Sequence, residues 1–364
     1  MTHSTFINTA ETLRNQLDQW QNRPWLAVDT EFVREETYRA HLCLIQVGDG
    51  ETNLCVDMLA LDPAPLFEFL ARPALTKVFH SASQDLELFV QHTGDCPRPL
   101  FDTQTAAALL GHGEQLGYAA LVERRLGATV DKSLSRTDWS KRPLSQPALD
   151  YAADDVRHLA ALYPGLRQEL EDCGRLIWLE EECARQCEAD RYRAKPELAF
   201  RAVKGLVRLS AEAQHRAARL AAWREEEAQR RNRPRRWILD DEALCQLAAR
   251  QPATVEQLKG VEGVSDKLIA RVGVDLIALL QQPNTDSTPL VTDIRPSPEQ
   301  RKRIQLLLDA LRAIGEKEQI APTLIAPRSD IETLARDGAA ADPRGTTLSS
   351  SGRPCSAHGP SPSV

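Results

Sequence analysis

Hydrophobic residues recur with two different periods along the chain, and the change of period divides it. Up to about residue 170, short runs rich in Val, Leu, Ile and Phe alternate with amphipathic segments of helical period. Four of the short runs predict strands: WLAVDTEF (25–32), HLCLIQVG (41–48), TNLCVDM (52–58) and KVFHSA (77–82). The first three are joined by short connections, which predicts a meander and therefore a mixed sheet.

The segments of helical period in this part of the chain predict flanking helices. They are DPAPLFEFLARP (62–73), SQDLELFVQHTG (83–94), TQTAAALLG (103–111), GYAALVERRLG (117–127) and SQPALDYAADDVRHLAALYPGLRQEL (145–170). We expect Ser83 to cap the second of these helices and Gly94 to close it. Residues 1–170 are therefore predicted to form one α/β domain, a mixed five-stranded sheet with flanking helices.

Beyond about residue 170 the hydrophobic spacing is helical throughout. We expect a helical connector over 171–208, containing a long helix at 175–193, and a helical domain over 209–290. Its helices are predicted near 210–231, 240–250, 254–259 and 265–280. A Pro-rich linker (283–298) leads to a third helical region, 297–337, whose first helix Ser297 should cap. Residues 338–364, rich in Gly, Pro and Ser, are predicted to be disordered.

Composition indicates a globular protein of more than one domain. The chain has 364 residues, 42% of them hydrophobic and 27% charged. Its net charge of −7 hides a basic segment, residues 201–239, with 11 Lys or Arg against 4 Asp or Glu. No apolar stretch could span a bilayer, and the N-terminal residues show no secretory signal. The eight cysteines are scattered, so we expect free thiols and a cytoplasmic location.

The first predicted strand ends in two carboxylates. Asp29 and Glu31 stand two positions apart, so their side chains point to the same face of the sheet. Neighbouring carboxylates repel each other unless a cation lies beside them, and hard oxygen ligands suit Mg²⁺ or Mn²⁺. Taken alone, the pair fits a metal site and an exposed strand end equally well.

Two more elements carry acidic residues. Asp85 lies in the first turn of a predicted helix, where an acid that favours the helix dipole is the simpler explanation. Tyr151 and Asp155, in YAADDVRHL, are four positions apart and share one helix face. Each element is weak evidence for a metal site when it is considered alone.

The order of the three elements is more specific. Asp-x-Glu at the end of the first strand, Asp on a helix after a later strand, and Tyr-x-x-x-Asp on a further helix resemble the DEDD family of 3′→5′ exonucleases, in its Tyr-containing subgroup. The segments VDTEFVRE, SQDLELF, DKSLSRTDWSKRPL and YAADDV resemble the ribonuclease D family closely, and the resemblance runs from about residue 25 to about residue 320. It implies a ribonuclease H-like fold.

The resemblance also implies roles for five catalytic residues and a cofactor of two divalent metal ions. Asp29 would bridge the ions, Glu31 and Asp155 would complete the first metal's ligands, Asp85 would hold the second metal, and Tyr151 would orient the attacking water. Such ions stabilise both the nucleophile and the leaving oxygen of an in-line displacement. His80, at the end of a predicted strand, is interpreted as a structural residue in preference to a catalytic base.

Basic residues suggest two places where RNA would be held. Arg136, Lys141 and Arg142 surround Trp139 just before the catalytic helix, and this suits phosphates and a stacked base. A Trp that anchors the loop to the core is an equally good interpretation. Farther on, the chain resembles the HRDC domain, a helical module shared by RecQ-type helicases and ribonuclease D. Its predicted phosphate contacts are Arg231, Arg233, Arg235, Arg236 and Lys267.

The family resemblance implies trimming of 3′ extensions on tRNA precursors and other small structured RNAs. The expected partner is RNA with a free 3′ end, bound by a monomer with no membrane and no obligate protein partner. The alternatives are a DNA 3′→5′ exonuclease or proofreader, a nucleic-acid-binding protein without turnover, and an HRDC-bearing scaffold. Residues 297–337 resemble the opening of a second, degenerate HRDC-like domain, and we hypothesise an altered or frameshifted terminus beyond it.

Overall fold

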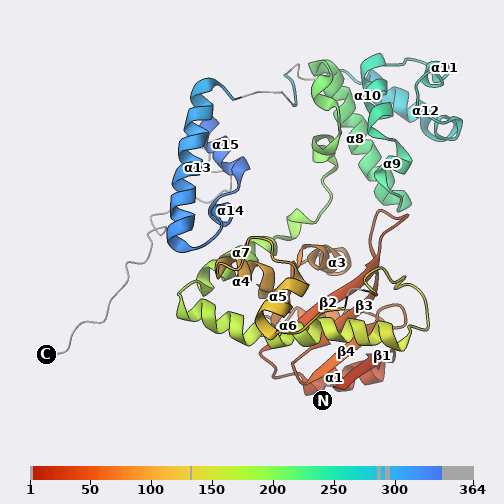
Figure 1. Ribbon diagram of the computed structural model, residues 1–364. Helices are drawn as coiled ribbons and strands as arrows, with labels where there is room; N and C mark the ends of the chain where they lie inside the picture. Colours follow the sequence, from red (N-terminus) through yellow and green to blue (C-terminus); the bar gives the residue numbers. More distant parts are fainter. Residues whose placement is uncertain (1–2, 132, 285–287, 292–295, 338–364) are drawn as a thin grey trace. The chain divides into compact units, whose positions relative to one another are not determined.

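The computed structural model describes residues 3–131, 133–284, 288–291 and 296–337 (Figure 1). Its contacts divide the chain into two compact units. The first comprises Met1–Ala106 and Gly117–Asp293, and the second comprises Ala107–Leu116 and Ile294–Val364. The domain boundaries expected from the sequence, near residues 170, 208 and 290, remain predictions. The predicted disordered tail, 338–364, lies outside the described residues.

A six-stranded mixed sheet forms the centre of the α/β region. Its strands are β1 (His3–Ile7), β2 (Trp25–Val33), β3 (His41–Gly48), β4 (Thr52–Asp57), β5 (Thr76–Phe79) and β6 (Leu100–Asp102). Their order in the sheet is β1-β4-β3-β2-β5-β6. β2–β3 and β3–β4 pair antiparallel, and the other three pairs are parallel. The predicted meander and the mixed character of the sheet are confirmed.

The predicted number of five strands is wrong, because the sheet has six. Both edge strands, β1 and β6, were missed among the strand-like runs. β6 has only three residues, which is too short to show an alternating pattern, and β1 carries three polar residues among five. Pairing with β4 and β5, respectively, is what makes these two segments strands.

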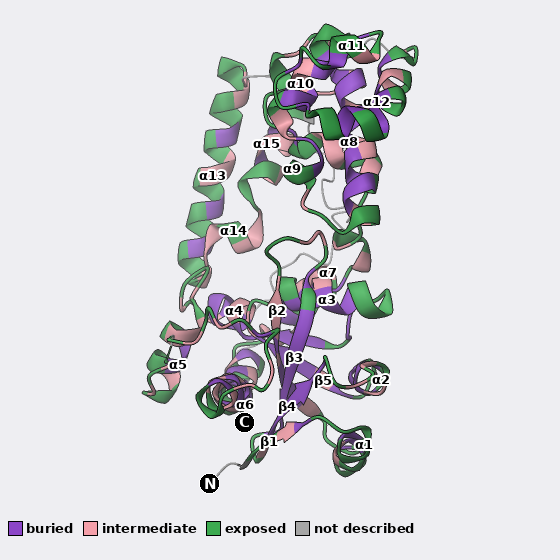
Figure 2. Ribbon diagram, turned by 90° about the vertical axis from the view of Figure 1, so that its right-hand side faces the viewer, coloured by how far each residue is buried: buried purple, intermediate pink, exposed green. Residues whose placement is uncertain are grey.

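Helices cover both faces of the sheet. They are α1 (Ala10–Gln19), α2 (Ala64–Leu70), α3 (Ser83–Thr93), α4 (Thr103–Leu109), α5 (Tyr118–Leu126) and α6 (Gln146–Asp172). Figure 2 shows the buried strands between α6 on one face and α1 and α2 on the other. Gly94 closes α3 with a φ of 80°, as predicted, but the expected cap at Ser83 is wrong. The helix begins one residue earlier than a Ser83 cap requires, so Ala82 is its N-cap.

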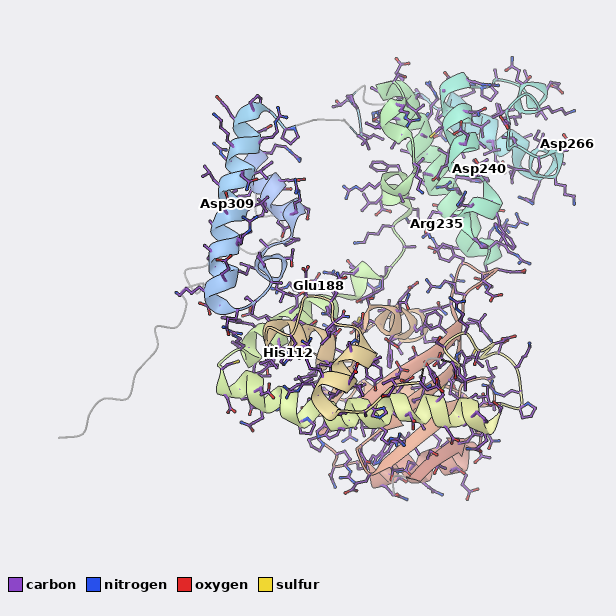
Figure 3. All side chains as sticks on the ribbon, viewed as in Figure 1. His112, Glu188, Arg235, Asp240, Asp266 and Asp309 are labelled. Carbon is purple, nitrogen blue, oxygen red and sulfur yellow. The ribbon has the colours of Figure 1, made fainter. Side chains whose placement is uncertain are left out.

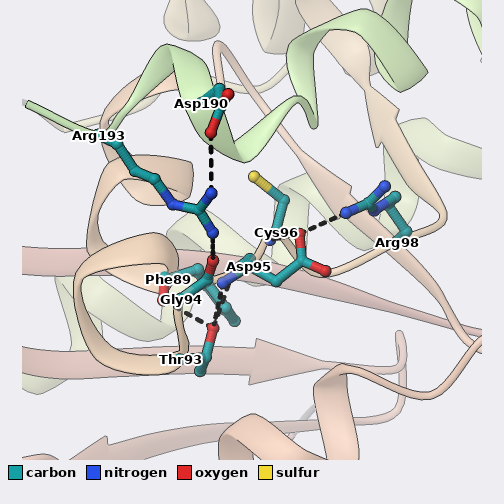
Figure 4. Close-up of polar contacts among 8 residues, drawn as sticks. All are labelled: Phe89, Thr93, Gly94, Asp95, Cys96, Arg98, Asp190 and Arg193. Carbon is teal, nitrogen blue, oxygen red and sulfur yellow. Dashed lines mark hydrogen bonds and ion pairs between the residues drawn. The ribbon is translucent and has the colours of Figure 1, made fainter. Parts of the chain in front are cut away.

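The connector is more broken than predicted. A single helix over 175–193 was expected, but α7 spans only Leu176–Gln186. Three 3₁₀ segments follow it in the connector: Ala189–Arg191, Pro196–Ala202 and Leu206–Arg208. The last carbonyl of α7 accepts a hydrogen bond from the Tyr192 hydroxyl at 2.8 Å. Arg193 then pairs with Asp190 at 2.8 Å and donates to the Gly94 carbonyl at 2.6 Å (Figure 4). These contacts fold the connector back onto the end of α3.

The region that resembles HRDC is helical, as predicted. Its helices are α8 (Ala211–Arg231), α9 (Arg235–Ile238), α10 (Asp241–Arg250), α11 (Val255–Leu258) and α12 (Asp266–Gln281). Side chains of Ser210, Asp240, Thr254 and Ser265 cap four of them. The short α9 was missed, because its four residues, two arginines followed by Trp and Ile, are too few to show a helical period. No helix among the described residues is long and apolar enough to cross a membrane.

The second unit contains three helices among its residues beyond 296. They are α13 (Pro298–Glu318), α14 (Pro322–Ile325) and α15 (Arg328–Asp337). Ser297 caps α13 as predicted, and Gln300 completes a capping box. Four buried apolar residues form the core between α13 and α15: Ile304, Leu311, Ile331 and Ala335. This small core is built in the region predicted to be a partial HRDC-like domain.

The turn between α11 and α12 gives a test of this packing. Gly263 has a φ of +82°, and a Cβ there would lie 3.0 Å from both Ala243 Cβ and Asp240 Oδ2. We expect Gly263→Ala to destabilise α10 and α12 by about 1–3 kcal/mol. Gly260→Ala, where the nearest atom is an ordinary 3.6 Å away, is the matched control and should change little. Hydrogen exchange of α10 and α12 amides measures both, and equal protection in the two variants would contradict the prediction.

Candidate metal centre

β2 carries the first two acidic residues of the site. Asp29 and Glu31 point to the same face, and they lie opposite Gln46 and Leu44 of β3. The pairing of β2 with β5 stops at Ala27, so both carboxylates stand on the part of β2 that pairs with β3 alone. The buried, apolar start of β2 therefore anchors the strand in the sheet. The far end of β2, which is not paired with β5, carries the two carboxylates.

α6 brings a third carboxylate to the same place. This helix packs across β2, β3 and β4 and presents Asp155 to the end of β2. One oxygen from each of Asp29, Glu31 and Asp155 lies within 4.8 Å of the others. All three side chains are partly buried. Three hard oxygen donors this close together, with no Lys or Arg among them, suit a divalent cation such as Mg²⁺ or Mn²⁺.

Asp85 joins these residues from α3. It is buried, and its Oδ1 accepts a hydrogen bond of 2.5 Å from the hydroxyl of Thr30, the residue between Asp29 and Glu31 in the sequence of β2. The start of α3 is shaped by Asp102 at the end of β6, whose carboxylate accepts from the Ser81 and Ala82 amides at 3.1 and 3.0 Å. Thr30 and Asp102 were not predicted from the sequence.

Burial, and in three of the four carboxylates also neighbouring charges, disfavours ionisation at this site. Burial raises the pKa of Asp29 to about 6. Burial, then the charges of Asp29 and Asp154, raise the pKa of Asp155 to about 8. Burial and three neighbouring carboxylates, Asp29 first, raise the pKa of Glu31 to about 9. Burial and the Asp29 charge hold the pKa of Asp85 well above its usual range. A bound cation would reverse this penalty, so the donor set fits a metal site.

Comparison with known proteins agrees with this geometry. Residues 4–171 match the 3′-5′ exonuclease family and residues 213–280 match the HRDC domain. The chain is 38% identical over 353 residues to ribonuclease D of Granulibacter bethesdensis, covering 92% of this chain and 86% of that protein. It is 39% identical over 340 residues to ribonuclease D of Zymomonas mobilis, with 90% and 86% covered.

A solved structure is similar over the same length. The crystal structure of Escherichia coli RNase D, an exoribonuclease involved in structured RNA processing, superposes with a TM-score of 0.83 at 33% identity, covering 92% of this chain and 90% of that one. The chain belongs to the ribonuclease D family. It is accordingly a metal-dependent 3′–5′ exoribonuclease with a ribonuclease H-like nuclease domain, and the DNA exonuclease alternative is not favoured.

Tyr151 lies beside the carboxylates, one turn before Asp155 on α6. Burial and then the charges of Asp155, Glu31 and Asp29 keep the pKa of Tyr151 above its usual range, so its phenol stays protonated. Trp139 packs against it, with ring centroids 6.2 Å apart. Trp139 is only 2% exposed, so its ring supports Tyr151 from the core side in this structure.

Tyr118 of α5 is a site residue that sequence reasoning missed. Its hydroxyl donates to the backbone carbonyl of Asp155, and its ring lies 5.3 Å from that of His80. His80 Nδ1 is 3.0 Å from the Thr103 hydroxyl, which in turn donates to the Phe79 carbonyl. These contacts tie His80 to its own strand end, in line with the structural role predicted for it.

The predicted RNA contacts near the site differ in their availability. Arg136 and Lys141 are exposed, and Lys141 lies 3.4 Å from Asp138. Arg142 is occupied: Nε and Nη2 donate to both oxygens of Asp57 at 2.7 and 2.6 Å, and Nη2 also donates to the Cys43 carbonyl. It therefore fastens the segment before α6 to β3 and β4.

The predicted contacts in the HRDC domain divide in the same way. Arg231, Arg233 and Arg235 pair with Glu227, Glu36 and Glu225, respectively. Arg236 and Lys267 are exposed, and neither forms an ion pair with any residue that the structure describes. The basic segment is thus only partly a free surface, and the sequence alone did not show which arginines were committed.

Metal binding should strengthen as pH rises. The raised pKa values mean that the metal-free folded state holds protons that the unfolded state has lost. This contribution to stability is complete near pH 4 and is lost as pH rises through about 6 to 9. Mg²⁺ has to displace those protons, so the increase in Tm on adding Mg²⁺ should grow from pH 6 to pH 9. Thermal melts with Mg²⁺ or EDTA at each pH measure it, and a constant increase would contradict the prediction.

Arg142 should act on stability. Asp57 is 3% exposed, so Arg142→Ala leaves a buried carboxylate without its partner and should lower the free energy of unfolding by about 3–5 kcal/mol. Lys141→Ala, one residue away with a side chain 80% exposed, is the control and should be nearly neutral. Urea unfolding separates the two. A stable Arg142→Ala protein with weakened RNA affinity would show instead that this guanidinium binds phosphate.

Proposed function

We propose that this enzyme trims the 3′ extensions of tRNA precursors and other small structured RNAs. It removes one nucleotide at a time from a free 3′ end and releases 5′-nucleoside monophosphates. The observation that carries the proposal is the cluster of Asp29, Glu31 and Asp155 oxygens within 4.8 Å, with Asp85 and Tyr151 beside it. The relative from E. coli, which is involved in structured RNA processing, supports the substrate class.

Four carboxylates provide enough oxygen ligands for two divalent ions, Mg²⁺ or Mn²⁺. Asp29, Glu31 and Asp155 would hold one ion, and Asp85 would hold the second, with Asp29 shared between them. Such ions, when bound, lower the pKa of a water and stabilise the charge that develops on the phosphate and the leaving 3′ oxygen. Burial and then the Asp29 charge raise the pKa of Asp85, and a shared pair of cations would relieve this penalty.

Side chains of the protein orient the attacking water. The protonated Tyr151 phenol donates a hydrogen bond and so fixes the attacking water on the Asp155 side of the site. Trp139 behind it and Tyr118, which binds the Asp155 carbonyl, restrict both residues to one position. A water held in this geometry reaches the terminal phosphodiester without losing further orientational freedom.

Exposed cations would guide the RNA. Arg136 and Lys141 before α6, and Arg236 and Lys267 in the HRDC domain, are the exposed positive charges among the predicted contacts, and Lys141 makes only a surface ion pair with Asp138. The other predicted contacts have structural partners, so we propose that they stabilise the fold. Carboxylates pair with Arg142, Arg231, Arg233 and Arg235, and Trp139 is buried. RNA affinity should decrease with rising salt because phosphate contacts release counterions.

The test is a gel time course with Mg²⁺ and a 5′-labelled tRNA that carries a short single-stranded 3′ tail. On RNA, the wild-type enzyme should produce a ladder that shortens from the 3′ end. The same tail made of DNA should be trimmed only weakly. Asp155→Asn removes one charge from the site and should slow trimming at least about a hundredfold, because several kcal/mol of charge stabilisation are lost.

Asp154→Asn is the matched control. It changes the adjacent aspartate on the same helix, which pairs with Arg157 at 2.8 Å and is 43% exposed. Its trimming rate should stay near that of the wild type. Equal trimming of DNA would contradict the proposed substrate, and normal turnover by Asp155→Asn would contradict the proposed site.

A further inference from the structure

The loop between β2 and β3, residues 34–40, makes contacts that have no part in the proposed catalytic mechanism. Tyr38 at its tip reaches the HRDC domain, where its hydroxyl donates to Glu225 Oε1 of α8. Arg235, labelled in Figure 3, completes the contact, since its Nη2 donates to Glu225 Oε1 at 2.7 Å and to the Tyr38 oxygen at 3.2 Å. We call these three residues the Tyr38 joint.

The Tyr38 joint is built around a buried charge. Glu225 is 3% exposed, and the Arg235 guanidinium lies 4.8 Å from the centre of the Tyr38 ring. Burial alone would raise the pKa of Glu225, but the hydrogen bonds from Arg235 and Tyr38 lower it below its usual range. The Glu225 carboxylate is therefore ionised, and a hydrogen bond to an ionised, buried group is stronger than one to a neutral group.

Two more contacts flank the joint. The Arg39 amide donates to Asn232 Oδ1 at 2.9 Å, and Arg233 lies 3.5 Å from Glu36. Asn232 closes α8 in the left-handed conformation, with a φ of 49°. The loop thus grips the C-terminal end of α8 and the segment that leads into α9.

The other side of the loop is fixed to the metal-binding elements. The loop continues directly from β2, which carries Asp29 and Glu31. Arg34 pairs with Glu87 at 2.8 Å, and Gln91 donates to the Ala40 carbonyl at 2.9 Å, so both ends of the loop are braced against α3. α3 carries Asp85. One loop therefore connects the HRDC domain to both elements that supply ligands from outside α6.

We propose that Tyr38 is a positioning residue, which fixes the HRDC domain against β2 and α3 so that RNA held by that domain enters the metal centre in one register. The proposal rests on the proposed function, since it requires RNA that contacts both domains. Without the Tyr38 hydroxyl, the docked arrangement loses the charge-assisted hydrogen bond to Glu225 and the longer one from Arg235. The apparent affinity for RNA that needs both domains then decreases with the docked fraction.

The experiment compares two substrates in Mg²⁺: the tailed tRNA, and a trinucleotide too short to reach the HRDC domain. Tyr38→Phe should raise KM for the tRNA by about tenfold, which the loss of the hydrogen bond to Glu225 alone would account for, with kcat unchanged. Its kcat and KM for the trinucleotide should equal those of the wild type. A residue that only stabilised the fold would not separate the two substrates.

Tyr163→Phe is the matched control, because it removes a hydroxyl from a buried Tyr of α6 whose ring packs on Trp25 and Phe101. It should leave KM for both substrates unchanged. Glu225→Gln approaches the same contact from the HRDC side and should also raise KM for the tRNA. Combined with Tyr38→Phe it should add little, because both changes weaken one contact.

Three outcomes would overturn the proposal. Tyr38→Phe and Glu225→Gln proteins with wild-type KM for the tRNA would show that the joint does not position RNA. An equal loss on both substrates would show that it acts through the metal centre or the fold. A wild-type enzyme that degrades neither substrate would overturn the proposed function itself, and this inference with it.

Discussion

Burial of neighbouring carboxylates is the constraint around which this enzyme is organised. Asp29, Glu31 and Asp155 have oxygens within 4.8 Å of one another. Burial raises the pKa of all three, and neighbouring charges raise it further for Glu31 and Asp155. Folding has to hold them together before any cation arrives. The buried start of β2 and the length of α6, which packs across five strands, supply the rigidity that this requires. A bound cation then offsets the electrostatic cost of holding ionised carboxylates together in a buried place.

The contacts that surround the metal centre hold its ligand-bearing elements in place. Thr30 and Asp102 fix Asp85 and the start of α3, while Arg142 and Trp139 hold the segment that leads into α6. Each of these contacts joins a ligand-bearing element to the sheet or to its neighbour. The Tyr38 joint extends this rule to the HRDC domain, because the strand that ends in carboxylates continues into the loop that grips α8.

Much of this could be predicted from the sequence, and the reason is local. Strand alternation and helix periodicity require only neighbouring residues, so four of the strands followed from them. The roles proposed for Asp29, Glu31, Asp85, Tyr151 and Asp155 came from the order of the acidic motifs and the family resemblance that it carries. What could not be predicted depends on contacts far apart in the chain. Arg142 meets Asp57, Arg233 meets Glu36, and Arg235 meets both Glu225 and Tyr38. Three of the predicted phosphate contacts are therefore committed to distant carboxylates by folding alone. Tyr118 carries no motif of its own.

The most direct test of the central claim is anomalous diffraction at the manganese edge from crystals of the full chain soaked in Mn²⁺. The account predicts one peak at coordination distance from oxygens of Asp29, Glu31 and Asp155, and a second beside Asp85 and Asp29. Clear density for all four carboxylates with no anomalous peak among them would contradict it, because these side chains would then be held together by the fold for some purpose other than binding a cation.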